Sequence, residues 1–277
     1  MSSNSNTTHA HGDGGAQDSE HEALVLVSLS GQGVLRLTLN QPTRFNALSQ
    51  AMLSALQAAL DQIDERVRVV VIAANGRAFC AGHDLAEMRS HPDEAWQRGL
   101  FQQCSRVMQT LVSLPQPVIA RVQGVAAAAG CQLVASCDLA VAADHADFGV
   151  SGINLGLFCS TPSVALSRNL SRKRAFQMLM SGDFISAQTA LEWGLLNDCV
   201  PEASLDTSIE QWCNTICGKS SVAVSIGKRL FYEQLERPLA EAYELASDAM
   251  ACNMMAEDVA EGIDAFFEKR PPSWKHC

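Results

Sequence analysis

Residues 117–138, PVIARVQGVAAAAGCQLVASCD, are the stretch that decides the fold. An apolar strand is predicted from Val118, and after Gly124 four consecutive alanines lead into a helix that opens near Gln132. Small side chains let a ligand approach the backbone, and the unpaired N–H groups of a helix start favour an anion or a developing oxyanion. Tight packing of a strand against a helix selects the same small residues. The stretch alone therefore leaves a ligand site and plain packing both open.

The composition indicates a globular protein with a sizeable core. The chain has 277 residues, of which 47% are hydrophobic and 18% charged, enough for one large or two modest domains. Its formal net charge of −10 argues against nucleic acid as a partner, because no basic block is available to neutralise phosphates. No apolar run reaches the roughly 18 residues that a membrane helix requires, so no membrane span is expected.

The cysteines and the first residues bear on the cellular compartment. Ten cysteines in a chain of this length do not make a disulfide scaffold, and their usage favours a reducing compartment. Cys213 and Cys217 share a predicted helix without a second ligand pair at zinc spacing, so no metal site is expected. Residues 1–22 are polar and are predicted to form a disordered tail. They show neither the apolar segment of a secretory signal nor the arginines of a mitochondrial presequence, so we expect a cytoplasmic protein.

Strands alternate with helices over the first half of the chain. Residues 23–29 and 33–40 are predicted to form a hairpin, and a helix over residues 47–63 is expected to begin with Asn46 as its N-cap. Further strands are expected at 67–73, 118–122 and 139–143, and a further helix at 95–114. This order predicts βαβ units and a mostly parallel sheet of the α/β class. From residue 161 onward the chain is predicted to be predominantly helical, with helical segments that include 202–217, 221–235 and 239–267.

A second turn of small residues follows the predicted strand at 67–73. It has the sequence NGRAFCAGHDL over residues 75–85. Ligands of parallel α/β sheets bind beyond the carboxyl ends of the strands, where both turns are expected to lie. Two such turns can bring two backbone N–H groups around one carbonyl oxygen, as the stabilisation of an enolate or a tetrahedral oxyanion requires. The loss of one such donor costs about 3–4 kcal/mol of transition-state stabilisation.

The order of the motifs identifies a family. The segments are LNQPTRFNAL (39–48), GRAFCAGHDLAEM (76–88), PVIARVQGVAAAAGCQLVASCDLAVA (117–142), ISAQTALEWGLLNDCVP (185–201) and EGIDAFFEKRPPSW (261–274). Taken together they resemble the enoyl-CoA hydratase/isomerase (crotonase) superfamily over about residues 23–275. The resemblance implies a crotonase-like ββα spiral core over residues 23–200 that carries an acyl-CoA site, and a helical C-terminal trimerisation region over 201–277. It also implies an acyl-CoA thioester as partner, a homo-trimer or hexamer, and no cofactor besides the coenzyme A of the substrate.

The resemblance also assigns roles to individual residues. It implies that the backbone N–H groups of His83 and Ala129 form the oxyanion hole. The residues implied to line the path of coenzyme A are Thr43, Arg44, Phe45, Ala81, Asp84 and Leu85, with Lys269 and Arg270 as further phosphate candidates. Arg44 suits a phosphate because its guanidinium offers a planar fork of donors. An ordinary surface arginine is the alternative.

The sequence departs from the hydratases of this family at two positions. Those enzymes use two glutamates, one as acid and one as base, and the matching positions here are Gln132 and Gly152. An amide has no useful proton affinity near neutral pH, and glycine has no side chain. The imidazole of His83 titrates in a useful range but could equally form a wall of the coenzyme pocket. Cys159 could be a nucleophile or a proton donor if its pKa were lowered, or simply a structural residue.

Three classes of function remain open from the sequence. The first is an acyl-CoA enzyme of lyase or isomerase type in fatty acid metabolism, which works chiefly by oxyanion stabilisation as a decarboxylase, an isomerase or a thioester hydrolase. The second is a hydratase that acts weakly or on an unusual substrate through water held by Gln132. The third is a non-catalytic acyl-CoA-binding protein. Ordinary hydration of a 2-enoyl-CoA is not expected, and the acyl group stays open.

Overall fold

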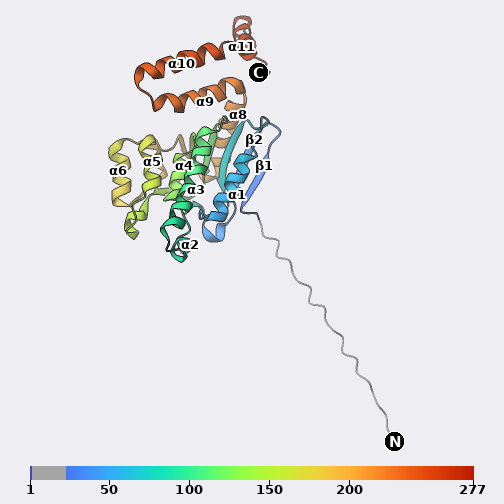
Figure 1. Ribbon diagram of the computed structural model, residues 1–277. Coiled ribbons are helices and arrows are strands. Elements are labelled where there is room, and N and C mark those ends of the chain that lie inside the picture. Colours follow the sequence, from blue (N-terminus) through green and yellow to red (C-terminus); the bar gives the residue numbers. More distant parts are fainter. Residues whose placement is uncertain (2–22) are drawn as a thin grey trace.

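The computed structural model, shown in Figure 1, describes Met1 and residues 23–277. It contains two β-sheets with helices packed around them. The larger sheet has six strands in the order β1-β2-β3-β5-β7-β10. These strands are β1 (Val25–Leu29), β2 (Val34–Leu39), β3 (Val69–Ala74), β5 (Val118–Val122), β7 (Leu139–Ala143) and β10 (Asp198–Val200). The smaller sheet has the order β4 (Ala78–Cys80), β6 (Val125–Ala127), β8 (Asp147–Gly149) and β9 (Phe184–Ser186). The disordered tail predicted over residues 1–22 lies, except for Met1, outside the described residues.

The predicted hairpin and parallel sheet are confirmed. β1 pairs with β2 in an antiparallel register that sets Leu29 opposite Leu35, and the turn between them contains Gly33 at a φ of +84°. The neighbours from β2 through β3, β5 and β7 to β10 are all parallel. Parallel strands place their carboxyl ends at one edge, so the turns that follow β3 and β5 emerge on the same side of the sheet.

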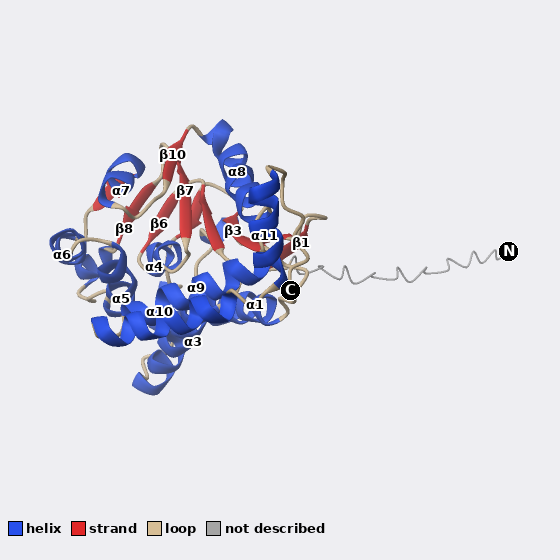
Figure 2. Ribbon diagram, turned by 90° about the horizontal axis from the view of Figure 1, so that it is seen from above, coloured by secondary structure: helices blue, strands red, loops and turns tan. Residues whose placement is uncertain are grey.

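Both faces of the larger sheet are covered by helices. All six residues of β3 are buried, as expected for a strand between two layers. Its alternate residues Val70 and Ile72 pack in the main core with α1 (Gln50–Asp61), α3 (Glu94–Ser113) and α4 (Ala129–Ala135). Val69 and Val71 pack instead against α8 (Leu205–Cys217). Figure 2 shows α8 on one side of the strands and α1 and α3 on the other.

The start of α1 differs from the prediction. Asn46 is not the N-cap, because the helix begins at Gln50 and the side chain of Ser49 accepts the capping hydrogen bond from the Met52 N–H at 3.2 Å. Before the helix, a short 3-10 turn over Pro42–Arg44 is followed by two residues in the left-handed region, Phe45 and Asn46. The spacing of apolar residues does not reveal such a turn, so the helix predicted from residue 47 begins three residues too early.

The last hundred residues are mostly helical, as predicted, with two differences. The short strands β9 and β10 were not expected, and the helix predicted over 239–267 is interrupted near Ala256. The remaining helices are α2 (Leu85–Ser90), α5 (Ser160–Asn169), α6 (Arg172–Ser181), α7 (Ala187–Trp193), α9 (Ser221–Leu235), α10 (Leu239–Asn253) and α11 (Glu257–Glu268), with 3-10 turns at Ser151–Leu155 and Glu202–Ser204. Figure 1 shows α9 and α10 side by side at one end of the molecule. Among residues 23–277, no helix is long and apolar enough to span a bilayer.

A buried ion pair anchors α9 to the core. The ammonium of Lys228 donates to the carbonyl oxygens of Leu111 (2.8 Å) and Gln116 (2.9 Å), and to Asp138 Oδ2 (2.7 Å). The hydroxyl of Tyr232 donates to the other carboxylate oxygen of Asp138 at 2.8 Å. Because Asp138 lies between α4 and β7, these bonds tie the C-terminal helices to the layer that holds the 117–138 stretch.

Candidate functional site

The two small-residue turns are in direct contact. Gly82 has a φ of +89°, and a Cβ atom there would lie 2.9 Å from the carbonyl oxygen of Ala127, 3.0 Å from Ala128 Cβ and 3.2 Å from the backbone nitrogen of Ala129. A residue with a side chain would therefore push the two turns apart. The sequence-based expectation that these turns meet is confirmed, and the glycine is what allows the close approach.

Two backbone N–H groups at this contact have no hydrogen-bond partner within the described part of the chain. They belong to His83 and Ala129, the two residues predicted for an oxyanion hole. Ala129 is the first residue of α4, and the preceding Ala128 has no side-chain group that could cap it. With only seven residues, α4 is too short for a dipole argument to add much, so the site depends on the two N–H groups themselves.

Backbone strain accompanies this arrangement. Ala128 has φ 48° and ψ −115°, a conformation that residues with a Cβ atom rarely adopt. Its own N–H donates to the carbonyl oxygen of Gly149 at 2.8 Å, which holds the strained peptide against the end of β8. Strain of this kind persists where the surrounding structure over-determines it, and it gathers at functional sites. Ala129, which follows Ala128, is the first residue of α4, and the first N–H groups of a helix have no acceptor within that helix.

The first and second motifs run side by side. The N–H of Ala81 donates to the carbonyl oxygen of Phe45 at 3.0 Å, and the N–H of Leu48 donates to that of Gly82 at 2.8 Å. Besides Arg44, four of the residues predicted to line the coenzyme path are exposed on the surface that these segments share, namely Thr43, Phe45, Ala81 and Leu85. The guanidinium of Arg77 lies 4.6 Å from the centre of the Phe45 ring. Arg77 is not among the residues predicted for the coenzyme path, although it directly follows Gly76 in the second turn of small residues.

The remaining two residues of the predicted path are paired with each other. Arg44 Nη2 lies 2.6 Å from Asp84 Oδ2, and the side chain of Asp84 is only 6% exposed. Asp84 also caps α2, because its Oδ1 accepts from the N–H groups of Ala86 at 3.0 Å and Glu87 at 3.1 Å. Asp84 therefore has a structural task, whereas the half-exposed guanidinium of Arg44 keeps donors that face solvent.

The side chain of His83 is a neutral imidazole with one unused nitrogen. Its Nδ1 lies 3.2 Å from the carbonyl oxygen of Leu48, so the tautomer that satisfies this oxygen carries the proton on Nδ1. Nε2 is buried and has no partner among residues 23–277. The ring stands edge-on to Phe101, with 5.4 Å between ring centroids. Burial lowers the pKa of His83 below its usual value of 6.5, more than the hydrogen bond to Leu48 raises it.

The lowered pKa of His83 predicts a pH dependence of stability. The unfolded chain takes up a proton at this ring more readily than the folded chain, so the contribution of His83 to stability is lost as the pH falls through about 6.5. His83→Asn keeps a donor for Leu48 and removes the titration. We expect the wild-type protein to lose more of its free energy of unfolding between about pH 8 and about pH 5 than this variant does. Equal losses in denaturant titrations would contradict this assignment.

Gln132 presents a second unused polar atom. The residue lies in the first turn of α4, is 4% exposed, and its Oε1 is buried without a partner among the described residues. Buried polar atoms nearly always have a hydrogen-bond partner. An unpaired amide oxygen three residues after Ala129 therefore indicates a place for water or for a polar group of a ligand.

Position 152 has no room for a carboxylate. A Cβ atom on Gly152 would lie 2.5 Å from the carbonyl oxygen of Leu157 and 2.8 Å from Cys159 Sγ. The thiol of Cys159 is nearly buried, and burial raises its pKa above the usual value of 9.0, although a hydrogen bond from the Gly152 N–H lowers it in part. The condition for a nucleophilic thiolate, a lowered pKa, is therefore not met, and Cys159 is a protonated thiol near neutral pH.

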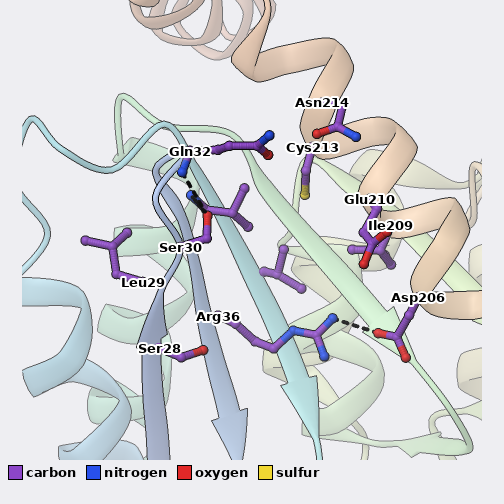
Figure 3. Close-up of a pocket in the computed structure, with 12 residues that line it drawn as sticks. Ser28, Leu29, Ser30, Gln32, Arg36, Asp206, Ile209, Glu210, Cys213 and Asn214 are labelled. Atoms are coloured by element: carbon purple, nitrogen blue, oxygen red, sulfur yellow. Dashed lines mark hydrogen bonds and ion pairs between the residues drawn. The ribbon is translucent and has the colours of Figure 1, made fainter.

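A separate pocket lies on the other side of the larger sheet. It has a volume of about 670 Å³ and is formed between the β1–β2 hairpin and α8 (Figure 3). Val71 of β3 also lines it. The ion pair between Arg36 and Asp206 crosses it at 2.7 Å. Since α4 covers the opposite face, this pocket is distinct from the two turns. Within residues 23–277, no group of three or more His, Cys, Asp or Glu side chains is placed to hold a metal ion.

Comparisons with known proteins find relatives along most of the chain. The family model described as enoyl-CoA hydratase/isomerase matches residues 30–277. The mitochondrial enoyl-CoA hydratase domain-containing protein 3 of Homo sapiens is 47% identical over 246 residues, which cover 88% of this chain and 81% of that protein. The protein of the same name from Mus musculus is 43% identical over 267 residues, which cover 96% of this chain and 89% of that protein.

Solved structures share the arrangement of strands and helices. An enoyl-CoA hydratase from Mycobacterium smegmatis superposes with a TM-score of 0.90 at 55% identity, over 91% of this chain and 99% of that one. The human enoyl-CoA hydratase domain-containing protein 3 superposes with a TM-score of 0.88 at 44% identity, over 91% of this chain and 100% of that one.

The names of the relatives correct one expectation. The human and mouse proteins are named as mitochondrial, which points to mitochondrial rather than cytoplasmic localisation. The prediction of a cytoplasmic protein is therefore wrong. It rested on composition alone in a segment of which only Met1 is described, and composition is a weak guide to targeting.

Proposed function

The chain belongs to the enoyl-CoA hydratase/isomerase family and has its crotonase fold, and from that premise we propose that it binds an acyl-CoA thioester. The thioester oxygen accepts hydrogen bonds from the N–H groups of His83 and Ala129. The observation that carries this proposal is the pair of unpaired N–H groups on two turns that Gly82 allows into contact. Coenzyme A enters as part of the substrate.

The chemical effect of this site is to stabilise negative charge on the thioester oxygen. When a bond at the α-carbon breaks, its electron pair moves onto that oxygen and forms an enolate. Donors already aimed at the oxygen need no reorganisation, and each contributes about 3–4 kcal/mol to the transition state. The N–H of Ala129 is available for this role because it belongs to the first residue of α4, and the first N–H groups of a helix have no acceptor within it.

We place the coenzyme on the exposed surface where the first and second motifs meet. Thr43, Phe45, Ala81 and Leu85 lie on this surface and would contact the pantetheine and adenine groups. Arg44 would contact a phosphate with the guanidinium N–H groups that its ion pair with Asp84 leaves free. Asp84 contributes by holding Arg44 and the start of α2 in place, and not by direct contact.

Ordinary hydration of a 2-enoyl-CoA does not fit this site. Hydration needs one group that accepts a proton from water and one that donates a proton to the α-carbon. The two positions that carry glutamate in the hydratases are Gln132 and Gly152, and Cys159 Sγ and a carbonyl oxygen fill the space beside Gly152. We therefore propose chemistry that requires only the oxyanion hole and one proton donor.

Decarboxylation of an acyl-CoA that bears a carboxylate at the α-carbon meets this requirement. The bond to the carboxylate breaks, CO2 leaves, and the electron pair is held as the enolate until a proton reaches the α-carbon. The raised pKa of Cys159 keeps its thiol protonated, which suits a proton donor. Thioester hydrolysis is the second candidate, and the unpaired Oε1 of Gln132, which could hold the attacking water, favours it.

Reactions of several acyl-CoA esters test the proposed function. Incubation with malonyl-, methylmalonyl- and enoyl-CoA, followed by mass spectrometry, should show loss of CO2 or release of free coenzyme A. Hydration of crotonyl-CoA should stay below ~10 s⁻¹, a typical enzyme turnover. If hydration reached that rate and also persisted in Gln132→Ala, the positions of the acid and the base would be assigned wrongly. Thermal stabilisation by acyl-CoA without any turnover would show that the protein binds acyl-CoA but does not catalyse a reaction of these esters.

We also propose that the protein is a homo-trimer or hexamer. The C-terminal helices expose large apolar side chains, among them Phe231, Tyr243, Met250, Phe266 and Phe267. An exposed apolar surface of this kind is typical of a contact with another protein. Analytical ultracentrifugation should give the mass of a trimer or its double, and a monomer at micromolar concentration would contradict the proposal.

A further inference from the structure

Asn46 is a fully buried amide whose donors and acceptor are all used. Its Nδ2 donates to the carbonyl oxygens of Asn75 at 2.9 Å and Ala78 at 3.0 Å. Its Oδ1 accepts from the N–H of Gln41 at 2.8 Å. The residue has a φ of 53° and an exposed fraction of 0%. One side chain thus joins the segment before α1 to the turn between β3 and β4.

Gln123 acts on the same turn from a third segment. It is 7% exposed, and its Nε2 donates to the carbonyl oxygens of Gly76 at 3.0 Å and Ala78 at 3.1 Å. The carbonyl oxygen of Ala78 therefore accepts hydrogen bonds from two buried amides. These side-chain donors fix the stretch that leads to Gly82.

The neighbours of Asn46 hold the residues directly before His83. On one side, the carbonyl oxygen of Phe45 accepts from the N–H of Ala81, and on the other, the N–H of Leu48 donates to the carbonyl oxygen of Gly82. Phe45 and Asn46 are both in the left-handed region, at φ 52° and 53°. Two consecutive non-glycine residues hold this conformation only where their surroundings enforce it, and the three hydrogen bonds of Asn46 do so.

We infer that Asn46 and Gln123 are positioning residues of the proposed oxyanion hole. Their hydrogen bonds hold the turn after β3 and the segment around Phe45, and that segment orients the peptide that ends in the N–H of His83. Neither side chain contacts the thioester. The inference rests on the proposed function, since it assigns these residues to the same site.

The test compares carbonyl polarisation with binding. The probe is para-dimethylaminocinnamoyl-CoA, a conjugated thioester whose absorbance moves to longer wavelength when its carbonyl oxygen accepts hydrogen bonds. Asn46→Gly removes the amide but permits the left-handed conformation. We expect this variant to lose roughly half or more of the red shift while its Kd for the probe stays within about threefold of wild type.

Asn40→Ala is the matched control. Asn40 is also a buried amide, 8% exposed, whose Nδ2 donates to the carbonyl oxygen of Ala23 and whose Oδ1 accepts from Asn75 Nδ2. It makes no hydrogen bond to the carbonyl oxygen of Ala78, which accepts from both Asn46 and Gln123. This variant should lose stability and keep the full red shift. A full red shift in Asn46→Gly, or an equal loss in Asn40→Ala, would overturn the inference.

Two further outcomes are distinguishable. If Asn46→Gly does not fold, the variant Gln123→Met tests the inference instead. It removes the amide of Gln123, the second donor to the carbonyl oxygen of Ala78, and leaves Asn46 in place. A full red shift in that variant overturns the inference, and a partial loss supports it. If the wild-type protein binds the probe without any red shift, the proposed function itself fails, and this differs from a wild-type shift that the variants leave unchanged.

Discussion

Gly82→Ala should lower the turnover of any acyl-CoA substrate about 10²–10³-fold, the effect of losing an oxyanion donor. The added Cβ atom would lie 2.9 Å from the carbonyl oxygen of Ala127 and 3.2 Å from the backbone nitrogen of Ala129. It would separate the two turns and cover the N–H that the thioester oxygen requires. We also expect the red shift of bound para-dimethylaminocinnamoyl-CoA to be lost. Absorbance spectra at saturating protein and steady-state rates measure the two effects.

Gly194→Ala separates this effect from a general loss of stability. Gly194 has a φ of +90°, nearly that of Gly82, but no atom lies within 4 Å of the position its Cβ would take. Both variants force alanine into the left-handed region at a cost of about 1–2 kcal/mol. Only Gly82→Ala should alter the red shift. A normal spectrum and normal turnover in Gly82→Ala would show that the two turns do not form the oxyanion hole.

Lys228→Met should destabilise the protein by about 3–5 kcal/mol, because removal of one partner leaves a buried charge without compensation. Asp138 would keep its bonds from Tyr232 (2.8 Å) and the Val118 N–H (2.6 Å) but lose its ammonium partner. Burial lowers the pKa of Lys228, while the nearby Asp138 raises it in part, as expected for a pair of charges taken out of water. The free energy of unfolding in denaturant measures the loss.

Two variants complete this experiment. Lys173→Met removes an exposed lysine at the start of α6 and should change stability by no more than about 0.5 kcal/mol. Lys228→Met combined with Asp138→Asn should recover part of the loss, since the amide removes the buried charge and keeps an oxygen that can accept a hydrogen bond. If Lys228→Met costs less than about 1 kcal/mol, the pair does not anchor the C-terminal helices as the structure indicates.

Local patterns in the sequence were sufficient to predict the core of the fold. The runs at Val69–Ala74 and Leu139–Ala143 consist of apolar residues alone, so a strand covered on both faces follows from composition and length. The strands Phe184–Ser186 and Asp198–Val200 have three residues each, and they exist only because β8 and β7 offer them partners. No window of the sequence carries that information.

In the candidate site, too, some features follow from local sequence patterns and others depend on contacts between distant segments. The contact between the turns at Gly82 and Ala129 could be expected from two small-residue segments that follow parallel strands. The pairing of Arg44 with Asp84 and the close fit of Cys159 against Gly152 depend on how distant segments pack. Asn46 was interpreted as a helix cap because asparagine is common there. Its true partners lie about thirty residues along the chain, at Asn75 and Ala78.

The absorbance spectrum of para-dimethylaminocinnamoyl-CoA bound to the wild-type protein reports directly on the proposed oxyanion hole. In that proposal the N–H groups of His83 and Ala129 together polarise the carbonyl of an acyl-CoA thioester. We expect saturable binding with a red shift that Gly82→Ala removes and Gly194→Ala retains. Saturable binding with the spectrum of the free thioester, or no binding at all, would contradict it.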